Sequence, residues 1–234
     1  MKVTYARQTH DHPDPLARFA HRRRLARSMD MVLAWLTGRH GNQRLLDYGC
    51  GKGRFLNELH LRMTEEKRSN VTLMGYEPFM KSRFPTYEIV SSIGEVPAGS
   101  VDIMTCFEVC EHLNGEDTRA FIACAHEKIV KGGLLLVSVP IMAGPALLLK
   151  EYARALLFRR MPDTTFPQIL RASLLGTLPA RTTDLKRSHR GYDWKATRDM
   201  LKAEFGNVDV VFSPFRWMGW YGNSQAFMVV RVGA

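Results

Sequence analysis

Apolar residues recur at helical and strand-like spacings along most of the chain, and they predict alternating helices and strands. Over residues 16–37 they return about every 3.6 positions, which predicts a helix that Gly38 and Gly41 end. A short strand over residues 44–48 leads into a run of glycines, and a helix over residues 54–62 begins directly after it. The apolar positions of the first helix are Leu16, Phe19, Leu25, Met29, Val32, Leu33 and Leu36.

The same pattern continues through the middle of the chain and indicates an α/β fold. Strands are predicted over residues 71–76, 87–90, 101–107 and 134–139, and a helix over residues 116–130. Lys131-Gly132-Gly133 indicates the end of that helix. Strands that alternate with helices predict a parallel sheet, covered on both faces and joined by right-handed crossovers.

The regular alternation stops after Pro140 and resumes near the C-terminus. There a helix is predicted over residues 194–205, and two strands over residues 208–212 and 226–232 form a closing hairpin. We expect one domain over residues 1–234. Its predicted parts are an N-terminal helical cap (1–43), a core (44–140), a helical insertion (141–190), and a C-terminal helix and hairpin (191–234).

Composition narrows the class of protein to an ordinary folded domain. Of the 234 residues, 45% are hydrophobic and 24% are charged, which argues against wholesale disorder. The longest nearly apolar run, residues 134–142, is far shorter than the roughly 20 residues of a membrane span. The first residues lack the apolar segment of a secretory signal.

The cysteines agree with a cytoplasmic location. Cys50, Cys106, Cys110 and Cys124 form no C-x-x-C pair and lie in stretches predicted as core. This pattern argues against a disulfide scaffold and a zinc ribbon, and it predicts reduced, buried thiols in a reducing compartment.

Charge is distributed unevenly along the chain, whose net charge is +10. Residues 1–44 hold nine Lys and Arg against three Asp and Glu (+6), residues 45–140 hold ten against 13 (−3), and residues 141–234 hold 14 against seven (+7). The two basic flanks indicate an anionic partner, which is a phosphate, a nucleic acid or a lipid headgroup surface. The alternative is diffuse, solvated surface charge.

The run from Asp47 to Gly53 carries the clearest chemical signal. It forms a D-x-G-x-G-x-G pattern between a predicted strand and a helix N-terminus, whose free N–H groups face a ligand. A P-loop is excluded because neither Ser nor Thr follows Lys52, and a dinucleotide fingerprint fails because Arg54 stands where its third glycine belongs. An acid before the glycines repels a pyrophosphate and suits a ligand that carries an ammonium group.

A second acid, Glu77, ends the next strand. At this position of doubly wound folds an acid accepts hydrogen bonds from ribose hydroxyls, and Phe79 is placed to stack on an adenine. S-adenosylmethionine carries an ammonium group and a ribose but no phosphate, so the two acids together indicate it. The alternative is a tight strand-to-helix turn with no ligand.

From residue 45 to residue 140 the chain resembles class I S-adenosylmethionine-dependent methyltransferases. The resemblance implies a Rossmann-like, doubly wound seven-stranded sheet with an antiparallel last strand and a helical insertion after the fifth strand. It also implies that Asp47, Gly49, Gly51 and Gly53 surround the methionine part of the cofactor, that Glu77 holds the ribose, and that the adenine lies near residues 91–97. The implied cofactor residues are Asp47, Gly49, Cys50, Gly51, Gly53, Glu77, Pro78, Phe79, Ser92 and Cys106.

Glu108, Glu111 and His112 form an E-x-x-E-H run, which a helical turn would place on one face. The run resembles that of ubiquinone-biosynthesis O-methyltransferases and of small-RNA 2′-O-methyltransferases, where such a cluster holds a divalent metal. By the same resemblance His189 is the candidate fourth ligand, and Mg²⁺, Mn²⁺ or Zn²⁺ fits the donor set. Alternatively, Glu111 and His112 act without a metal as a general base or positioning pair, or they are purely structural.

Two further segments suggest what the acceptor is. Residues 144–160 form a basic amphipathic helix that lies in a membrane interface, covers a greasy substrate or packs into the core. Residues 215–221 are rich in aromatic side chains that suit a ring, a lipid tail or a membrane interface, and with Arg216 they suit a nucleotide base.

We therefore predict methyl transfer to a hydroxyl of a small, lipid-linked or glycan acceptor, by a cytoplasmic protein that associates peripherally with the inner membrane face. The alternatives are an RNA methyltransferase and, in a different class, a cofactor-binding regulatory protein without transferase activity.

Overall fold

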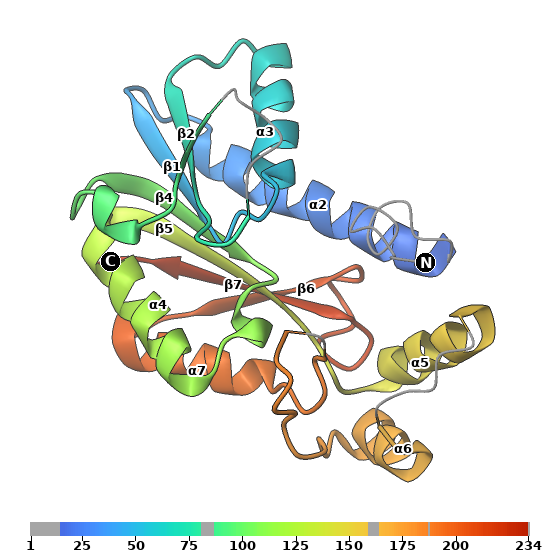
Figure 1. The fold of residues 1–234 in the computed structure, drawn as a ribbon. Coiled ribbons are helices and arrows are strands. Elements are labelled where there is room, and N and C mark those ends of the chain that lie inside the picture. The colour runs from blue at the N-terminus through green and yellow to red at the C-terminus, as the bar shows by residue number, and fades with distance from the viewer. Residues whose placement is uncertain (1–14, 81–86, 159–163, 187, 234) are drawn as a thin grey trace. The chain divides into compact units, whose positions relative to one another are not determined.

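The computed structural model describes residues 15–80, 87–158, 164–186 and 188–233 (Figure 1). The helices are α2 (Pro15–Leu36), α3 (Arg54–Glu65), α4 (Gly115–Lys128), α5 (Pro145–Phe158), α6 (Phe166–Leu175) and α7 (Trp194–Phe205), with short 3-10 turns η1 (Ile93–Glu95) and η2 (Cys110–His112). The strands are β1 (Gln43–Tyr48), β2 (Val71–Tyr76), β3 (Glu88–Val90), β4 (Val101–Phe107), β5 (Ile129–Pro140), β6 (Asp209–Ser213) and β7 (Gln225–Arg231). In these described residues no helix is long and apolar enough to span a bilayer.

The seven strands form one sheet in the order β3-β2-β1-β4-β5-β7-β6. Strands β1 to β5 pair in parallel. The start of β5 and the end of β7 run antiparallel, because the Val232 N–H donates to the Gly133 carbonyl (3.0 Å) and the Gly132 N–H donates to the Val232 carbonyl (2.7 Å). The predicted α/β sheet with an antiparallel last strand is confirmed.

The chain order of the strands reverses between β1 and β4, and this reversal positions the site. From β1 the chain crosses outward to β2 through α3, whereas from β4 it crosses to β5 through α4 in the opposite direction. Right-handed crossovers then place α3 and α4 on opposite faces of the sheet. Ligands of doubly wound sheets bind at the carboxyl ends of strands that flank such a reversal.

The centre of the sheet is apolar on both faces. Leu45 and Leu46 of β1, Ile103 and Met104 of β4 and Leu135 of β5 are fully buried. Such unbroken apolar runs are typical of parallel strands that are covered by helices on both sides.

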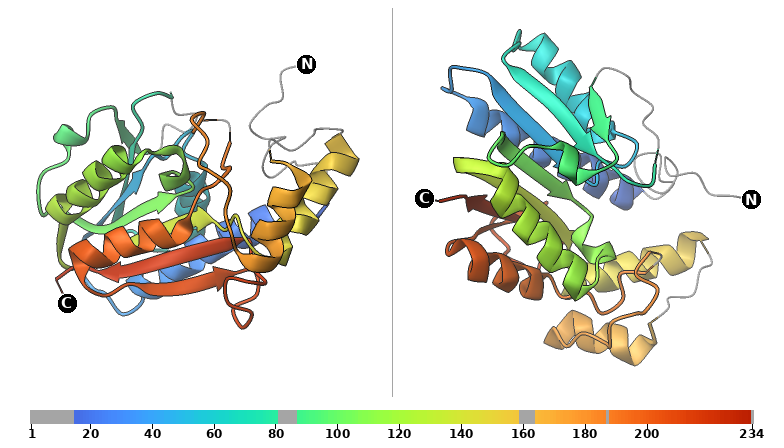
Figure 2. Two further views of the ribbon diagram at one scale, coloured as in Figure 1. Left: turned by 90° about the horizontal axis from the view of Figure 1, so that it is seen from below. Right: turned by 60° about the vertical axis from the view of Figure 1, so that its left-hand side comes forward.

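The chain divides into two compact units. Unit 1 comprises residues 1–28, 140–194 and 211–226, and unit 2 comprises residues 29–139, 195–210 and 227–234. In unit 2, α4 and α7 lie side by side, joined by a hydrogen bond between the side chains of His126 and Glu204. In unit 1, α5 and α6 lie side by side (Figures 1 and 2). The expectation of one domain with four segments stays a prediction. One boundary between the units, between Val139 and Pro140, lies one residue before a predicted segment boundary.

The secondary structure differs from the predicted elements at two places. The helix expected over residues 116–130 ends at Lys128, and Lys131-Gly132-Gly133 belongs to β5. A side chain at Gly133 would overlap the Asp102 carbonyl, so glycine is needed there for close strand packing and not for a helix end. Helix α6 lies within the predicted helical insertion, but its bounds were not predicted, because its apolar residues fall on more than one face.

Candidate functional site

Asp47 is the penultimate residue of β1 and is buried, and it faces Thr105 of β4. The two residues are register partners, and the Thr105 hydroxyl donates to Oδ1 of Asp47 at 2.7 Å. Burial raises the pKa of the Asp47 carboxyl to about 7, the Thr105 hydrogen bond opposes this, and the charge of Glu77 adds to it. Without a cationic partner, Asp47 is therefore half protonated at neutral pH.

The glycines after Asp47 form a tight loop that is fixed to neighbouring segments. Gly49 has φ +73°, and an added side chain would overlap Val109, so only glycine suits this turn. The N–H groups of Gly49 and Cys50 both donate to the Tyr76 carbonyl, at 2.8 and 3.1 Å. Gly53 starts α3 at φ +75°, and the Tyr87 hydroxyl donates to its carbonyl at 2.5 Å. The loop therefore presents the N-terminus of α3 to a ligand.

Glu77 connects the tip of β2 to this loop. Its Oε2 accepts a hydrogen bond from the Gly51 N–H (3.0 Å), and its Oε1 accepts one from the Phe79 N–H (2.9 Å). A carboxylate has about four acceptor positions, so Glu77 retains capacity for two further donors, such as a pair of hydroxyls. Pro78 and Phe79 are exposed, and the Phe79 ring, 88% accessible, is available for stacking.

Two cysteines near these acids are held in the thiol form. Burial is the main factor that raises the pKa of Cys50 and of Cys106, and in both cases the charge of Asp47 adds to it. The Sγ atoms of Cys106 and Cys110 lie 3.8 Å apart, and both thiols are buried. The prediction of free, buried thiols is confirmed for Cys50, Cys106 and Cys110, while Cys124 is half-buried.

The segment after β4 differs from the predicted helical turn. Glu108 has φ +58°, and the 3-10 turn covers only Cys110–His112. The Glu108 N–H donates to the Ser138 carbonyl (3.0 Å), and the Ser138 hydroxyl donates to Glu108 Oε1 (3.3 Å), so β5 holds this residue. The prediction that Glu108, Glu111 and His112 share one helical face is therefore wrong. Glu111 is fully buried, and its charge contributes to the raised pKa of Cys106.

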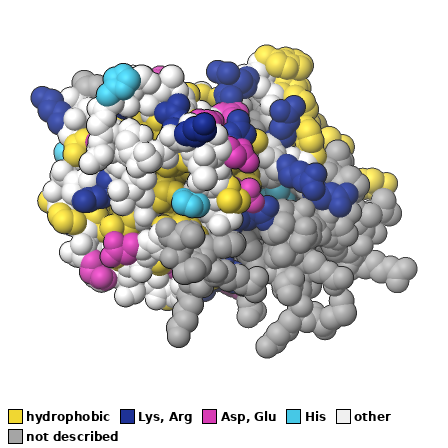
Figure 3. Space-filling model, turned by 90° about the horizontal axis from the view of Figure 1, so that it is seen from above, with side chains coloured by type: hydrophobic (Ala, Val, Ile, Leu, Met, Phe, Trp, Pro, Cys, Tyr) yellow, Lys and Arg dark blue, Asp and Glu magenta, His cyan; other side chains and the backbone are white. Residues whose placement is uncertain are grey.

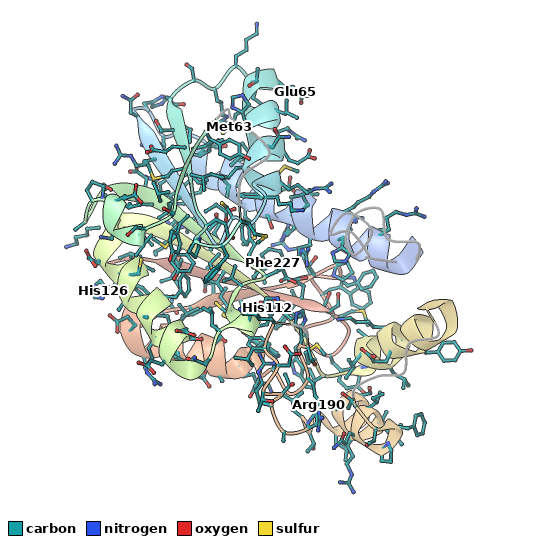
Figure 4. All side chains as sticks on the ribbon, viewed as in Figure 1. Met63, Glu65, His112, His126, Arg190 and Phe227 are labelled. Carbon is teal, nitrogen blue, oxygen red and sulfur yellow. The ribbon has the colours of Figure 1, made fainter. Side chains whose placement is uncertain are left out.

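His112 ends the 3-10 turn and is half-buried (Figure 4). It follows the carboxyl end of β4, so it belongs to the same edge of the sheet as Asp47 and Glu77. His189 belongs to unit 1, whereas the other candidate ligands belong to unit 2. The metal set that includes His189 stays a prediction.

Ser92 caps a short turn in unit 2. Its hydroxyl accepts a hydrogen bond from the Gly94 N–H (3.3 Å), and its own N–H donates to Glu95 Oε1 (2.9 Å), which completes a capping box. This local role accounts for a serine here, and its contact with an adenine stays a prediction.

Two residues of the site escaped the sequence analysis. Thr105 is a threonine in a mostly apolar strand, where its hydroxyl is buried and needs a hydrogen-bond partner. A polar residue within such a strand could have indicated a contact with the site. Tyr87 contacts Gly53 across 34 residues of chain, and no local pattern indicates that pairing.

A comparison with models of protein families identifies the family of the chain. A sequence model described as a methyltransferase domain matches residues 9–177. The chain belongs to this methyltransferase family. With its seven-stranded sheet and switch-point site, this methyltransferase has the class I S-adenosylmethionine-dependent fold. A comparison with curated proteins found no match.

Solved methyltransferase structures share the fold of this methyltransferase at low sequence identity. The CurJ carbon methyltransferase is 12% identical with a TM-score of 0.55, over 90% of this chain and 54% of its own. The small RNA methyltransferase HEN1 is 16% identical with a TM-score of 0.57, over 91% of this chain and 25% of its own. The N-methyltransferase NodS from Bradyrhizobium japonicum WM9 is 12% identical with a TM-score of 0.52, over 90% and 98%. The chain spans about half the length of the first structures that it matches.

The residues present fit the cofactor that the family implies. The raised pKa of Asp47 is the expected property of a buried carboxylate that awaits a cation, and an ammonium group supplies one. Among the residues that the structure describes, an added side chain at Gly51 would meet only the end of Met80, at 3.5 Å, so these residues leave room above the loop for a ligand. Asp47 would hold the amino-acid part of S-adenosylmethionine, and Glu77 would hold its ribose.

Proposed function

We propose that this methyltransferase methylates a hydroxyl group of a small, lipid-linked or glycan acceptor. The observation that carries the proposal is the placement of three side chains at the carboxyl edge of β1, β2 and β4. Asp47 and Glu77 lie at the ends of β1 and β2, and His112 lies in the turn after β4. Two acids suit the cofactor, and an imidazole is the remaining group with the chemistry to accept a proton at neutral pH.

The chain's own residues have separable tasks. Asp47 and the N-terminus of α3 bind and orient the amino-acid part of the cofactor, and Glu77 accepts from the ribose hydroxyls. When bound, S-adenosylmethionine supplies a methyl group activated by a positive sulfonium. His112 accepts the proton that the acceptor hydroxyl loses, at a ring nitrogen, and buried Glu111 supports the turn that carries His112. Rate enhancement then depends mainly on positioning.

Two further features support oxygen as the methylated atom and a lipid-linked or glycan molecule as the acceptor. The E-x-x-E-H run resembles that of the ubiquinone-biosynthesis O-methyltransferases, and the segment between β5 and α7 combines apolar and basic residues. Carbon, nitrogen and RNA acceptors occur among the methyltransferases that share the fold, so the acceptor has to be identified by assay.

Methyl transfer from labelled S-adenosylmethionine to quinol, lipid-linked and glycan acceptor pools tests the proposal. With an acceptor in hand, His112→Asn should lower kcat by about 10² to 10⁴, which is typical for loss of a general base, and leave the Kd of the cofactor unchanged. His40→Asn, at an exposed histidine shortly before β1, is the matched control. Transfer to RNA alone would overturn the acceptor class, and a His112→Asn variant with full kcat would remove its role as base.

Chelation separates the base from the metal alternative. If His112 works without a metal, EDTA should leave turnover unchanged. Loss of turnover that Mn²⁺ restores would instead assign a metal to Glu111 and His112.

A further inference from the structure

The net positive charge of the protein is concentrated in one of its two units. The ranges that make up unit 1 hold 17 of the 33 Lys and Arg residues but only 6 of the 23 Asp and Glu residues, a net charge of +11. Unit 2 holds 16 basic and 17 acidic residues, a net charge of −1. Unit 2 contains the cofactor residues, so their binding does not account for the positive charge of unit 1.

Exposed apolar side chains are concentrated in the same unit. On α6, Phe166, Leu170 and Leu174 recur every fourth residue, which places them along one face, and all three are exposed. Leu175 at the end of the helix is 74% accessible. A neighbouring side of α6 is already buried through Ile169, Ala172 and Ser173. The helix therefore has a second apolar face that the described residues do not cover.

Helix α5 continues this surface. Leu149 and Tyr152 share one face and are 66% and 68% accessible, whereas Leu147 and Glu151 are buried. For Leu149 and Tyr152 the alternative of core packing does not hold. The turn before α5 is tied to α6, because the Gly144 N–H donates to the Ala172 carbonyl at 3.0 Å.

The aromatic segment 215–221 lies against the same two helices. The ring of Trp220 is beside Gly176 at the end of α6, and the backbone of Tyr221 is beside Gly144. Buried Asn223 fixes the segment, since its Nδ2 donates to the carbonyls of Phe215 (2.7 Å) and Gly219 (2.6 Å) and its Oδ1 accepts from the Phe215 N–H (2.6 Å). Trp217 is held 82% accessible by this ordered loop.

Basic side chains are interspersed with these apolar ones. Lys150 of α5, Arg171 of α6 and Arg216 of the aromatic segment are exposed. Figure 3 shows Lys and Arg side chains beside hydrophobic ones on the face that it draws. Leucine and aromatic side chains among lysines and arginines are the composition of a protein surface that lies in a lipid headgroup region.

We propose that this surface of unit 1, formed by α5, α6 and residues 215–221, docks on an anionic lipid bilayer. Its apolar side chains enter the interface, and its basic side chains are attracted to the acidic headgroups. Single-stranded RNA binds mainly through stacked aromatic and basic side chains, and it leaves the α6 leucines without a partner. A second copy of the chain would bring two units of +11 together, so their repulsion opposes a dimer through this face.

Vesicle sedimentation of the full chain tests the proposal. Binding to vesicles of phosphatidylcholine with phosphatidylglycerol should exceed binding to phosphatidylcholine alone by at least about tenfold and should weaken as salt rises. Leu174→Glu and Trp217→Glu should each reduce binding to the anionic vesicles on the order of tenfold or more. Arg171→Glu should weaken binding and lower its dependence on salt.

A matched substitution in unit 2 controls for a nonspecific effect. Leu61 of α3 is 52% accessible, close to the 54% of Leu174, so Leu61→Glu adds the same charge at similar exposure and should leave vesicle binding unchanged. Calorimetry with S-adenosylhomocysteine should give the same Kd for all four variants, which shows that they are folded and keeps this test separate from methyl transfer.

Several results would overturn the proposal. They are an absence of binding to anionic vesicles, equal binding to neutral ones, or equal loss in the Leu61→Glu control. A dimer in light scattering that Leu174→Glu dissociates would assign the surface to a second copy. Tight oligonucleotide binding that the same variant abolishes would assign it to RNA.

Discussion

At the residue scale, Asp47 has to satisfy two opposed requirements. A carboxylate that is buried to bind an ammonium group destabilises the empty protein when it is charged. The pKa of the Asp47 carboxyl is about 7 in the folded protein and near 3.8 ordinarily. At a pH between these two values, the folded state therefore keeps a proton that the unfolded state has lost. The stabilisation that this proton brings is complete below pH 4 and is lost as pH rises through 7, a change of roughly 4 kcal/mol.

Asp47→Asn should therefore stabilise the protein without cofactor while it weakens cofactor binding. We expect Tm at pH 8 to rise, and the gain to shrink at pH 5, where the native carboxyl is already neutral. Thermal denaturation at both pH values measures this, with Asp30→Asn, an exposed site on α2, as control. An equal gain at both pH values would contradict the assignment of the effect to this proton.

The same proton should make cofactor affinity depend on pH. Because the ammonium group binds the ionised form, the Kd should rise by up to about tenfold for each pH unit below 7. Calorimetry in two buffers of different ionisation enthalpy should detect proton release near pH 6. A constant Kd between pH 5.5 and 8 would show that another group carries the ammonium.

At the element scale, the Gly49–Gly53 loop depends on a contact made by the segment before β3. Tyr87→Phe removes the hydrogen bond to the Gly53 carbonyl and should destabilise the protein by about 1 kcal/mol. It should weaken cofactor binding several-fold, because the loop and the N-terminus of α3 lose a fixed position. Tyr221→Phe, at an exposed position of unit 1, is the control for both measurements. Unchanged affinity would show that the loop is held without this bond.

The ordered aromatic segment makes a second prediction at this scale. Asn223→Ala leaves one N–H and two carbonyls without the partners that they have now, so it should lower the free energy of unfolding by about 2 to 4 kcal/mol. Denaturant unfolding measures this loss, and Asn207→Ala, which is exposed, should have little effect. A loss of less than 1 kcal/mol would indicate that the loop does not depend on Asn223.

Elements were predictable where the local pattern and the tertiary role agree. Strands β2 and β4 and helix α7 have the predicted bounds, since their apolar spacing is also their packing. The positions of Asp47, the glycines and Glu77 at strand ends were predictable because the strands and the glycine turn are visible in the local pattern, and their contact with a cofactor stays a prediction. The start of β5 was not predictable, because Gly133 is needed where the strand packs closely against the backbone of Asp102, which is distant in the sequence. Glu108 was misjudged because its pairing with Ser138 on β5 overrides the helical spacing.

At the scale of the whole molecule, the two proposals assign different partners to the two units. All residues that fit the cofactor belong to unit 2, and the proposed lipid surface belongs to unit 1. Local stability follows local binding, so each ligand should protect its own unit.

Hydrogen exchange measures this separation directly. S-adenosylhomocysteine should slow exchange in peptides over residues 45–54 and 73–79 and leave residues 166–176 unchanged. Anionic vesicles should do the reverse. Protection of both regions by either ligand would mean that the two sites are energetically coupled, contrary to this assignment.

The protonated state of Cys50 and Cys106 affects how long the enzyme survives with its cofactor. A thiolate is a strong nucleophile, and one beside an activated methyl group would become S-methylcysteine, which permanently blocks the site. Burial and the neighbouring acids raise the pKa of both thiols, so each sulfur keeps its hydrogen at neutral pH and is a poor competitor for the methyl group. Burial, to which the charge of Asp47 adds, thus disfavours the thiolate form that self-alkylation would require.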